Sequence, residues 1–105
     1  MLTEKKVLEI FTDYLKEDQA TEVVWTRRGV TVMLWESAGQ EWSEAVCCDT
    51  PEKLFDKLLD SFTGYQEYLL LQKKEQIGEA DRQKIQELCQ RYVEKRKEEE
   101  GCDCL

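Results

Sequence analysis

The spacing of hydrophobic and polar residues changes twice along the chain, and each change marks a different kind of element. Near the N-terminus, apolar residues from Val7 to Leu15 recur at the three- and four-residue spacing of an amphipathic helix. Thr3 precedes this stripe and is a suitable N-cap. The stripe fades in the polar stretch 17–20, so we expect the first helix to end there.

Residues 22–36 have a different character, because β-branched and aromatic side chains dominate. This composition is typical of strands. The pair Arg28-Gly29 is suited to a two-residue hairpin turn, with glycine supplying the positive φ that such turns require. A second break at 37–40 leads into another strand-like segment, 41–48. The sequence therefore predicts three strands in an antiparallel meander.

The start of the next helix is the strongest local signal in the chain. Thr50 supplies a capping side chain, Pro51 occupies the first helical position and Glu52 lies in the first turn. Apolar residues then follow on one face from Leu54 to Phe62. We expect this helix to pack that face against the sheet.

Two glycines divide the remaining helical sequence. The helix either continues through Gly64, at a cost of about 1 kcal/mol relative to alanine, or is split there. Gly78 precedes a last apolar stripe within 85–93, which includes Cys89. The predicted fold is α+β over residues 1–101: a helix, a three-stranded antiparallel β-meander, then two or three C-terminal helices. Residues 102–105 are expected to form a flexible tail.

All three tryptophans fall in the predicted sheet. A turn at Arg28-Gly29 places Trp25 opposite Val32 and puts Trp35 on the other side of the sheet. If Ala38-Gly39 is also a two-residue turn, Trp35 pairs directly with Trp42. Exposed aromatic pairs of this kind are typical of binding or dimerisation surfaces.

Helices on one side only would leave this pair uncovered, together with a methionine and an acidic rim that favours a basic partner. The predicted interaction face consists of Trp35, Trp42, Met33, Glu36, Glu41 and Glu44. The alternative is that the C-terminal helix, or a register slip of one residue, covers the indoles.

A run of leucines gives a second reason to expect self-association. Tyr68, Leu69, Leu70 and Leu71 are apolar on more than one side of a helix. Either two helices enclose this segment or it forms a subunit contact, most commonly in a two-fold dimer. The candidate residues for that contact are Tyr68, Leu70 and Leu71.

The net charge of −8 and the pI of about 4.6 exclude whole classes of partner. The acidic residues are spread through the folded part, whereas phosphate-tracking surfaces need clustered Lys and Arg. We therefore expect no binding to nucleic acid or to an anionic membrane surface. No apolar stretch approaches the roughly 20 residues of a membrane-spanning helix, and no signal-peptide pattern is present.

Five cysteines and the absence of histidine limit the available chemistry. The odd number and the pairs Cys47-Cys48 and Cys102-Asp103-Cys104 make a poor disulfide framework, so we expect reduced thiols and a cytoplasmic location. Adjacent strand residues point to opposite faces, which disfavours a zinc site. Without histidine or a phosphate-binding loop, catalysis is not expected, and neither is a cofactor.

These observations favour a small, acidic, non-catalytic interaction or regulatory protein. It would bind a protein partner, or itself, through the aromatic face of its sheet. Two alternatives remain open: thiol or metal handling by Cys47, Cys48, Cys102 and Cys104, and acidic mimicry of nucleic-acid phosphates at a basic site.

Overall fold

The elements of the structure follow the order that the sequence predicts. The computed structural model describes residues 1–36 and 40–101. Its elements in chain order are α1 (Glu4–Ile10), α2 (Thr12–Glu17), β1 (Thr21–Thr26), β2 (Gly29–Trp35), β3 (Trp42–Cys48), α3 (Pro51–Leu71) and α4 (Glu79–Gly101). The strands form an antiparallel meander in the order β1-β2-β3. The predicted α+β class is confirmed.

The first helical segment is broken in two at Phe11. As expected, Thr3 caps α1, its side chain accepting a hydrogen bond from the Lys6 amide at 3.1 Å. Phe11 leaves helical geometry, with φ −98° and ψ 14°. Its fully buried ring stacks on Tyr92 at a centroid distance of 4.5 Å and lies 5.3 Å from the ring of Phe55. The break is invisible in the sequence because the apolar spacing continues across it.

A buried carboxylate turns the chain from α2 into β1. Asp18 accepts hydrogen bonds from the Tyr14 hydroxyl at 2.7 Å, the Thr21 hydroxyl at 2.8 Å and the Ala20 amide at 3.1 Å. Burial raises the pKa of Tyr14 above its ordinary value, and its contact with Asp18 adds to this. Because a buried charge needs such partners, the cluster fixes the direction in which the sheet leaves the helices.

The β1–β2 turn differs by one residue from the prediction. Thr26 pairs with Gly29, so the turn residues are Arg27 and Arg28, and Trp25 lies opposite Val30 rather than Val32. Neither arginine has a positive φ, whereas Gly29 has a φ of 130°. Glycine therefore corrects the strand direction after the turn instead of forming the turn. The pairing shifts by two residues, so each side chain keeps the face that the sequence predicts.

Helix α3 begins as predicted and runs without interruption. Thr50 accepts a hydrogen bond from the Lys53 amide at 3.1 Å, and Pro51 follows in the first turn. The helix continues through Gly64 as one element, so it is not split there. Two helices, α3 and α4, therefore follow the sheet.

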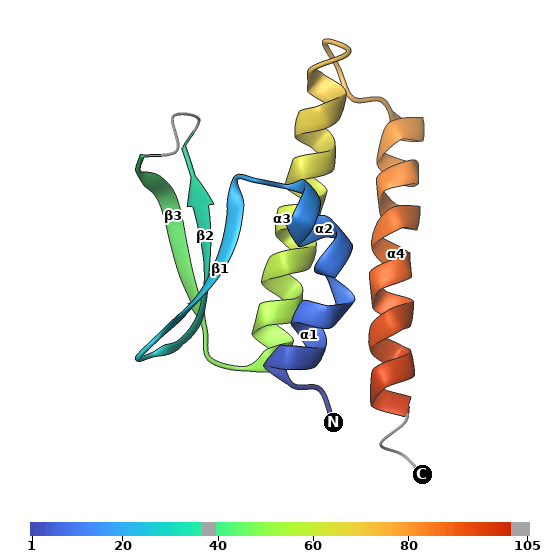
Figure 1. The fold of residues 1–105 in the computed structure, drawn as a ribbon. Coiled ribbons are helices and arrows are strands. Elements are labelled where there is room, and N and C mark those ends of the chain that lie inside the picture. Colours follow the sequence, from blue (N-terminus) through green and yellow to red (C-terminus); the bar gives the residue numbers. More distant parts are fainter. Residues whose placement is uncertain (37–39, 102–105) are drawn as a thin grey trace.

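The molecule is layered from the sheet to α4 (Figure 1). The α1–α2 segment and α3 lie next to the sheet, and α4 packs against α1 and α3 on the side away from it. The core between these layers contains Val7, Phe11, Tyr14, Val30, Val32, Cys48, Leu54, Phe55, Leu58, Phe62 and Tyr92. Cys89 is half-buried and packs against this core, close to its predicted place.

Over the described residues, no helix is both long and apolar enough to cross a bilayer. The predicted tail at 102–105 and the predicted turn at Ala38-Gly39 lie outside the described residues.

Candidate functional site

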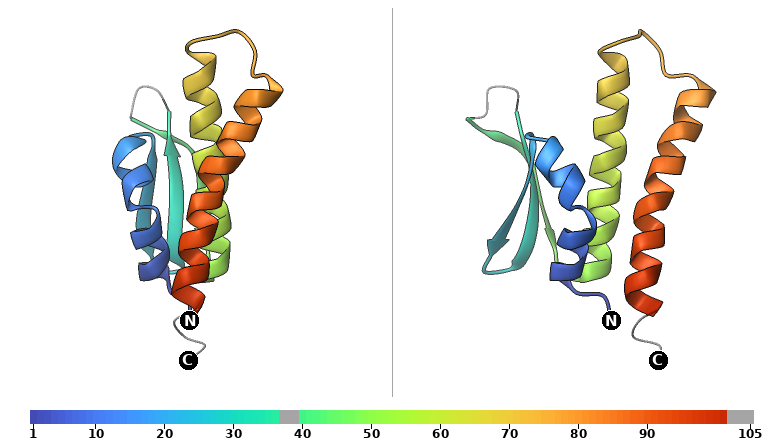
Figure 2. Two further views of the ribbon diagram at one scale, coloured as in Figure 1. Left: turned by 90° about the vertical axis from the view of Figure 1, so that its right-hand side faces the viewer. Right: turned by 45° about the vertical axis from the view of Figure 1, so that its right-hand side comes forward.

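One face of the sheet meets the helices and the other does not. Val30, Val32 and Cys48 face the core and α3, so the alternate residues of each strand lie on the opposite side. Figures 1 and 2 show every helix on one side of the sheet. We call the other side the open face; it carries Glu22, Val24, Thr31, Met33, Trp35, Trp42, Ala45 and Cys47.

Two tryptophans pair at one end of the open face, as predicted. Trp35 lies opposite Trp42, with ring centroids 5.1 Å apart and an interplanar angle of 64°. The Trp35 indole N–H donates a hydrogen bond to Glu22 Oε2 at 2.6 Å, which fixes this half-buried ring. Trp42 remains 53% exposed. The geometry is an edge-to-face pair with one immobilised ring and one ring open to contact.

Met33 departs from the predicted exposure. Its side chain is only 6% exposed, although it lies on the open face. Met33 sits on the central strand between Glu22 on one edge strand and Ala45 on the other, with Trp35 two residues along. Neighbours on all sides therefore cover it without any helix. Met33 therefore adds little to the solvent-accessible surface of the open face.

Glu44 also differs from the prediction, because β3 contains an irregularity. Trp35 pairs with Trp42, yet Leu34 pairs with Glu44, so Ser43 is an extra residue on β3. This bulge moves Glu44 to the helix side of the sheet, where it forms an ion pair with Lys57 of α3. The acidic rim of the open face therefore lacks Glu44. Glu36 and Glu41 remain exposed beside the tryptophan pair.

The same bulge decides where the two adjacent cysteines point. Cys47 is exposed on the open face, and its thiol donates to the Arg28 carbonyl at 3.4 Å. Cys48 is buried against the core, and burial raises the pKa of its thiol. The two thiols cannot bind one metal ion from opposite faces. Within 1–36 and 40–101, no cluster of three or more metal-ligating side chains occurs, and Cys102 and Cys104 lie outside these ranges.

The candidate self-association segment lies at the C-terminal end of α3, and its first residue, Tyr68, lines a groove between the sheet and α3. Tyr68 is 58% exposed and Leu71 51% exposed, whereas Leu70 is half-buried. Tyr68 lines a groove of about 460 Å³ together with Leu34 and Tyr65. The structure thus leaves part of the predicted self-association segment accessible, at the end of α3 that extends past the sheet (Figure 1).

A second cleft, of about 740 Å³, is lined by residues of α2, α3 and α4. Tyr92 lines it, and its hydroxyl donates to Asp13 Oδ1 at 3.1 Å. Burial raises the pKa of Tyr92, and the Asp13 carboxylate adds to this. A phenol held protonated at neutral pH is a poor base and a poor nucleophile. This pair therefore works as a tie between α2 and α4.

Sequence reasoning missed several residues of the open face. Thr31, Ala45 and Cys47 complete it, and the β1–β2 turn places Arg27 and Arg28 at its far end. Counting alternate residues back from Trp35 along β2 does place Thr31 on the open face. Ala45 and Cys47 depend on the bulge at Ser43, for which the sequence carries no signal.

No protein-family model, no curated protein and no solved structure matches this chain.

Proposed function

We propose that the chain is a non-catalytic interaction protein and that its open face binds a protein partner, which includes a second copy of the chain. The observation that carries the proposal is a half-exposed Trp42 on an apolar sheet face that every described helix leaves uncovered. Tryptophan is one of the side chains enriched among the residues that contribute most to binding at the centre of protein interfaces.

The composition of the open face supports the same proposal. An antiparallel sheet that packs one face on a core ordinarily presents polar side chains on the other. Here the outward residues include Val24, Trp42, Ala45 and Cys47, whereas Glu22 and Thr31 are the polar side chains of the face. Exposed apolar side chains grouped on one face are typical of interaction sites.

We also propose that the chain acts in the cytoplasm, and two further observations support this location and the absence of catalysis. Burial raises the pKa of Tyr14, Tyr65 and Tyr92. Two of these phenols, Tyr14 and Tyr92, are engaged in structural hydrogen bonds, and the sequence has no histidine. The thiols of Cys47, Cys48 and Cys89 are free, which suits a reducing compartment.

The chain offers a matched pair of variants for the test. Trp42 lies on the open face, whereas Trp25 is 68% exposed but shares its side of β1 with the core-packed Val23. Binding partners are first captured with the wild-type chain, and the complex is then rebuilt from purified proteins. We expect Trp42→Ala to weaken that complex by roughly a hundred-fold, as for an interface anchor, and Trp25→Ala to leave the affinity nearly unchanged.

Calorimetry measures both affinities, and circular dichroism verifies that each variant is folded. Equal losses from the two variants, or undiminished binding by Trp42→Ala, would contradict the proposal. So would a chain that binds neither another protein nor itself.

A further inference from the structure

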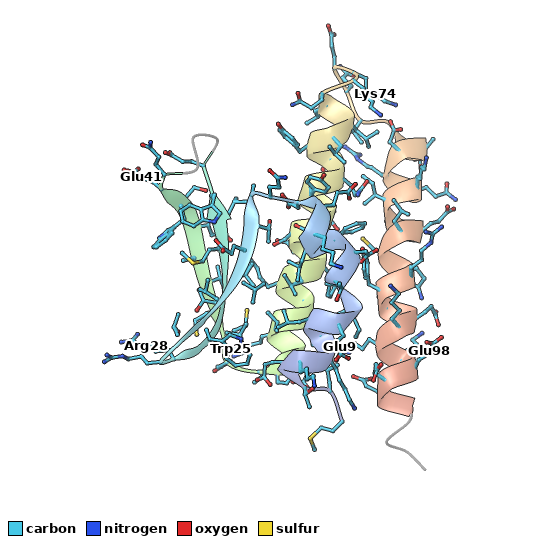
Figure 3. The ribbon with its side chains drawn as sticks, in the orientation of Figure 1. Glu9, Trp25, Arg28, Glu41, Lys74 and Glu98 are labelled. Carbon is cyan, nitrogen blue, oxygen red and sulfur yellow. The ribbon has the colours of Figure 1, made fainter. Side chains whose placement is uncertain are left out.

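The two ends of the open face carry opposite charges. Arg27 and Arg28 form the exposed tip of the β1–β2 hairpin, and Glu36 and Glu41 are exposed at the β2–β3 end. Figure 3 shows Arg28 and Glu41 at opposite ends of the sheet. In the part of the chain that the structure describes, none of these four side chains takes part in an ion pair.

The bulk of the side chains is distributed just as unevenly. The glutamate end holds the paired indoles of Trp35 and Trp42, whereas the arginine end holds Thr31 opposite Cys47. The half of the open face near the glutamates therefore carries larger side chains than the half near the arginines. Two such surfaces fit together only when the tryptophan half of each copy faces the Thr31–Cys47 half of the other.

We infer that the occupant of the open face is a second copy of this chain, packed sheet to sheet with its strands antiparallel to the first. The inference rests on the proposed function and specifies its partner. A two-fold axis across the strands places Trp42 of each copy over the Thr31–Cys47 half of the other. The same axis brings each arginine tip to the glutamate end of the second copy.

The other face-to-face arrangement is disfavoured on both counts. A two-fold axis along the strands would place glutamates against glutamates, and like charges in contact oppose association. It would also bring the two tryptophan halves together and leave the two Thr31–Cys47 halves apart. The twist of the sheets favours neither arrangement, because in both of them the strand directions of the two packed sheets can lie within about 30° of each other.

The size of the face predicts a weak dimer. Strands β2 and β3 have 7 residues each, and at about 3.3 Å per residue and 4.8 Å between strands the face spans roughly 23 by 14 Å. This area, roughly 320 Å² per copy, is smaller than that of stable specific interfaces and corresponds to a weak, transient contact. We therefore expect a dissociation constant in the micromolar range. In so weak a dimer, the four contacts between the arginine tips and the glutamate ends should change the dissociation constant measurably.

Charge exchange at the two ends tests the arrangement. One variant carries Arg27→Glu and Arg28→Glu, and the other carries Glu36→Arg and Glu41→Arg. Alone, each variant brings like charges together at both ends of the dimer, and we expect its dissociation constant to rise by more than about ten-fold. Mixed in equal amounts, the two variants restore opposite charges at both ends, and the mixture should dimerise nearly as tightly as the wild-type chain.

The control variant carries Arg82→Glu and Lys84→Glu on α4, which lies on the far side of the molecule from the sheet. It changes the net charge as much as the arginine-tip variant does, and it should dimerise like the wild-type chain at moderate salt. Sedimentation equilibrium provides the dissociation constants, and circular dichroism verifies folding.

Each outcome decides the inference. Variants that dimerise normally alone, or a mixture no tighter than its components, overturn the antiparallel arrangement. A wild-type chain that stays monomeric overturns the second copy as occupant. The proposed function survives either result if a different protein binds in a Trp42-dependent way, and it fails only when that dependence is absent.

Discussion

At the residue scale, two glycines inside regular elements have different roles. Gly29 opens β2 with a φ of 130°, a conformation that side-chain-bearing residues rarely adopt. Gly64 lies in the middle of α3, and a Cβ added there would meet no atom within 4 Å. The hairpin therefore requires its glycine, whereas the helix does not.

This difference predicts stability changes of opposite sign. Gly29→Ala should lower the free energy of unfolding by about 1–3 kcal/mol, because the backbone would be strained. Gly64→Ala should raise it by about 1 kcal/mol, through the greater helix propensity of alanine. Urea unfolding of the two variants measures both, and changes of the same sign would refute the assigned roles.

At the scale of elements, the junction between α2 and β1 depends on a protonated phenol. Tyr14 donates to the buried Asp18, and Tyr92 donates to Asp13 between α4 and α2. Burial raises the pKa of both tyrosines above the ordinary value of about 10. Both contacts are therefore complete at neutral pH.

The raised pKa values predict a loss of stability in alkali. Above a pH of about 10 the unfolded chain releases these phenolic protons while the folded chain keeps them, so stability falls by up to about 1.4 kcal/mol per pH unit for each tyrosine. Below that pH the contribution is fully present. Tyr14→Phe or Tyr92→Phe should reduce the slope of stability against pH in this range. Urea unfolding measured at several alkaline pH values gives the slope, and an unchanged slope in both variants would contradict this explanation.

The helices and strands also show which parts of the fold could be predicted from the sequence. Helix caps at Thr3 and Thr50 and the strand composition suffice for the order of elements, because these signals are local. The bulge at Ser43 is not local: it reverses the faces of Glu44 and of the cysteines through pairing with β2. The open face was thus predictable at Trp35 and Trp42, and not farther along β3, beyond Ser43.

At the scale of the whole molecule, one arrangement explains the layers, the tryptophans and the charges. The helices gather on one side of the sheet (Figures 1 and 2), which leaves an apolar face with opposite charges at its ends. A second copy with antiparallel strands would cover the apolar face and bring opposite charges together at both of its ends. Because salt screens the four charge contacts and also the repulsion between two chains of net charge −8, the contacts are isolated by comparing variants. We expect added salt to narrow the difference in dissociation constant between the wild-type chain and the variant with Arg27→Glu and Arg28→Glu. Sedimentation across a salt series measures this, and a difference that does not change with salt would contradict the role given to the arginine tip.

Hydroxyl-radical footprinting of the purified chain tests the central claim most directly, because two exposed tryptophans report from one molecule. Oxidation of Trp42 and Trp25 is followed by mass spectrometry at concentrations below and above the micromolar range. Burial of the open face predicts that Trp42 becomes protected as concentration rises while Trp25 stays reactive. Equal reactivity of Trp42 at every concentration, or protection of Trp25 alone, would contradict it.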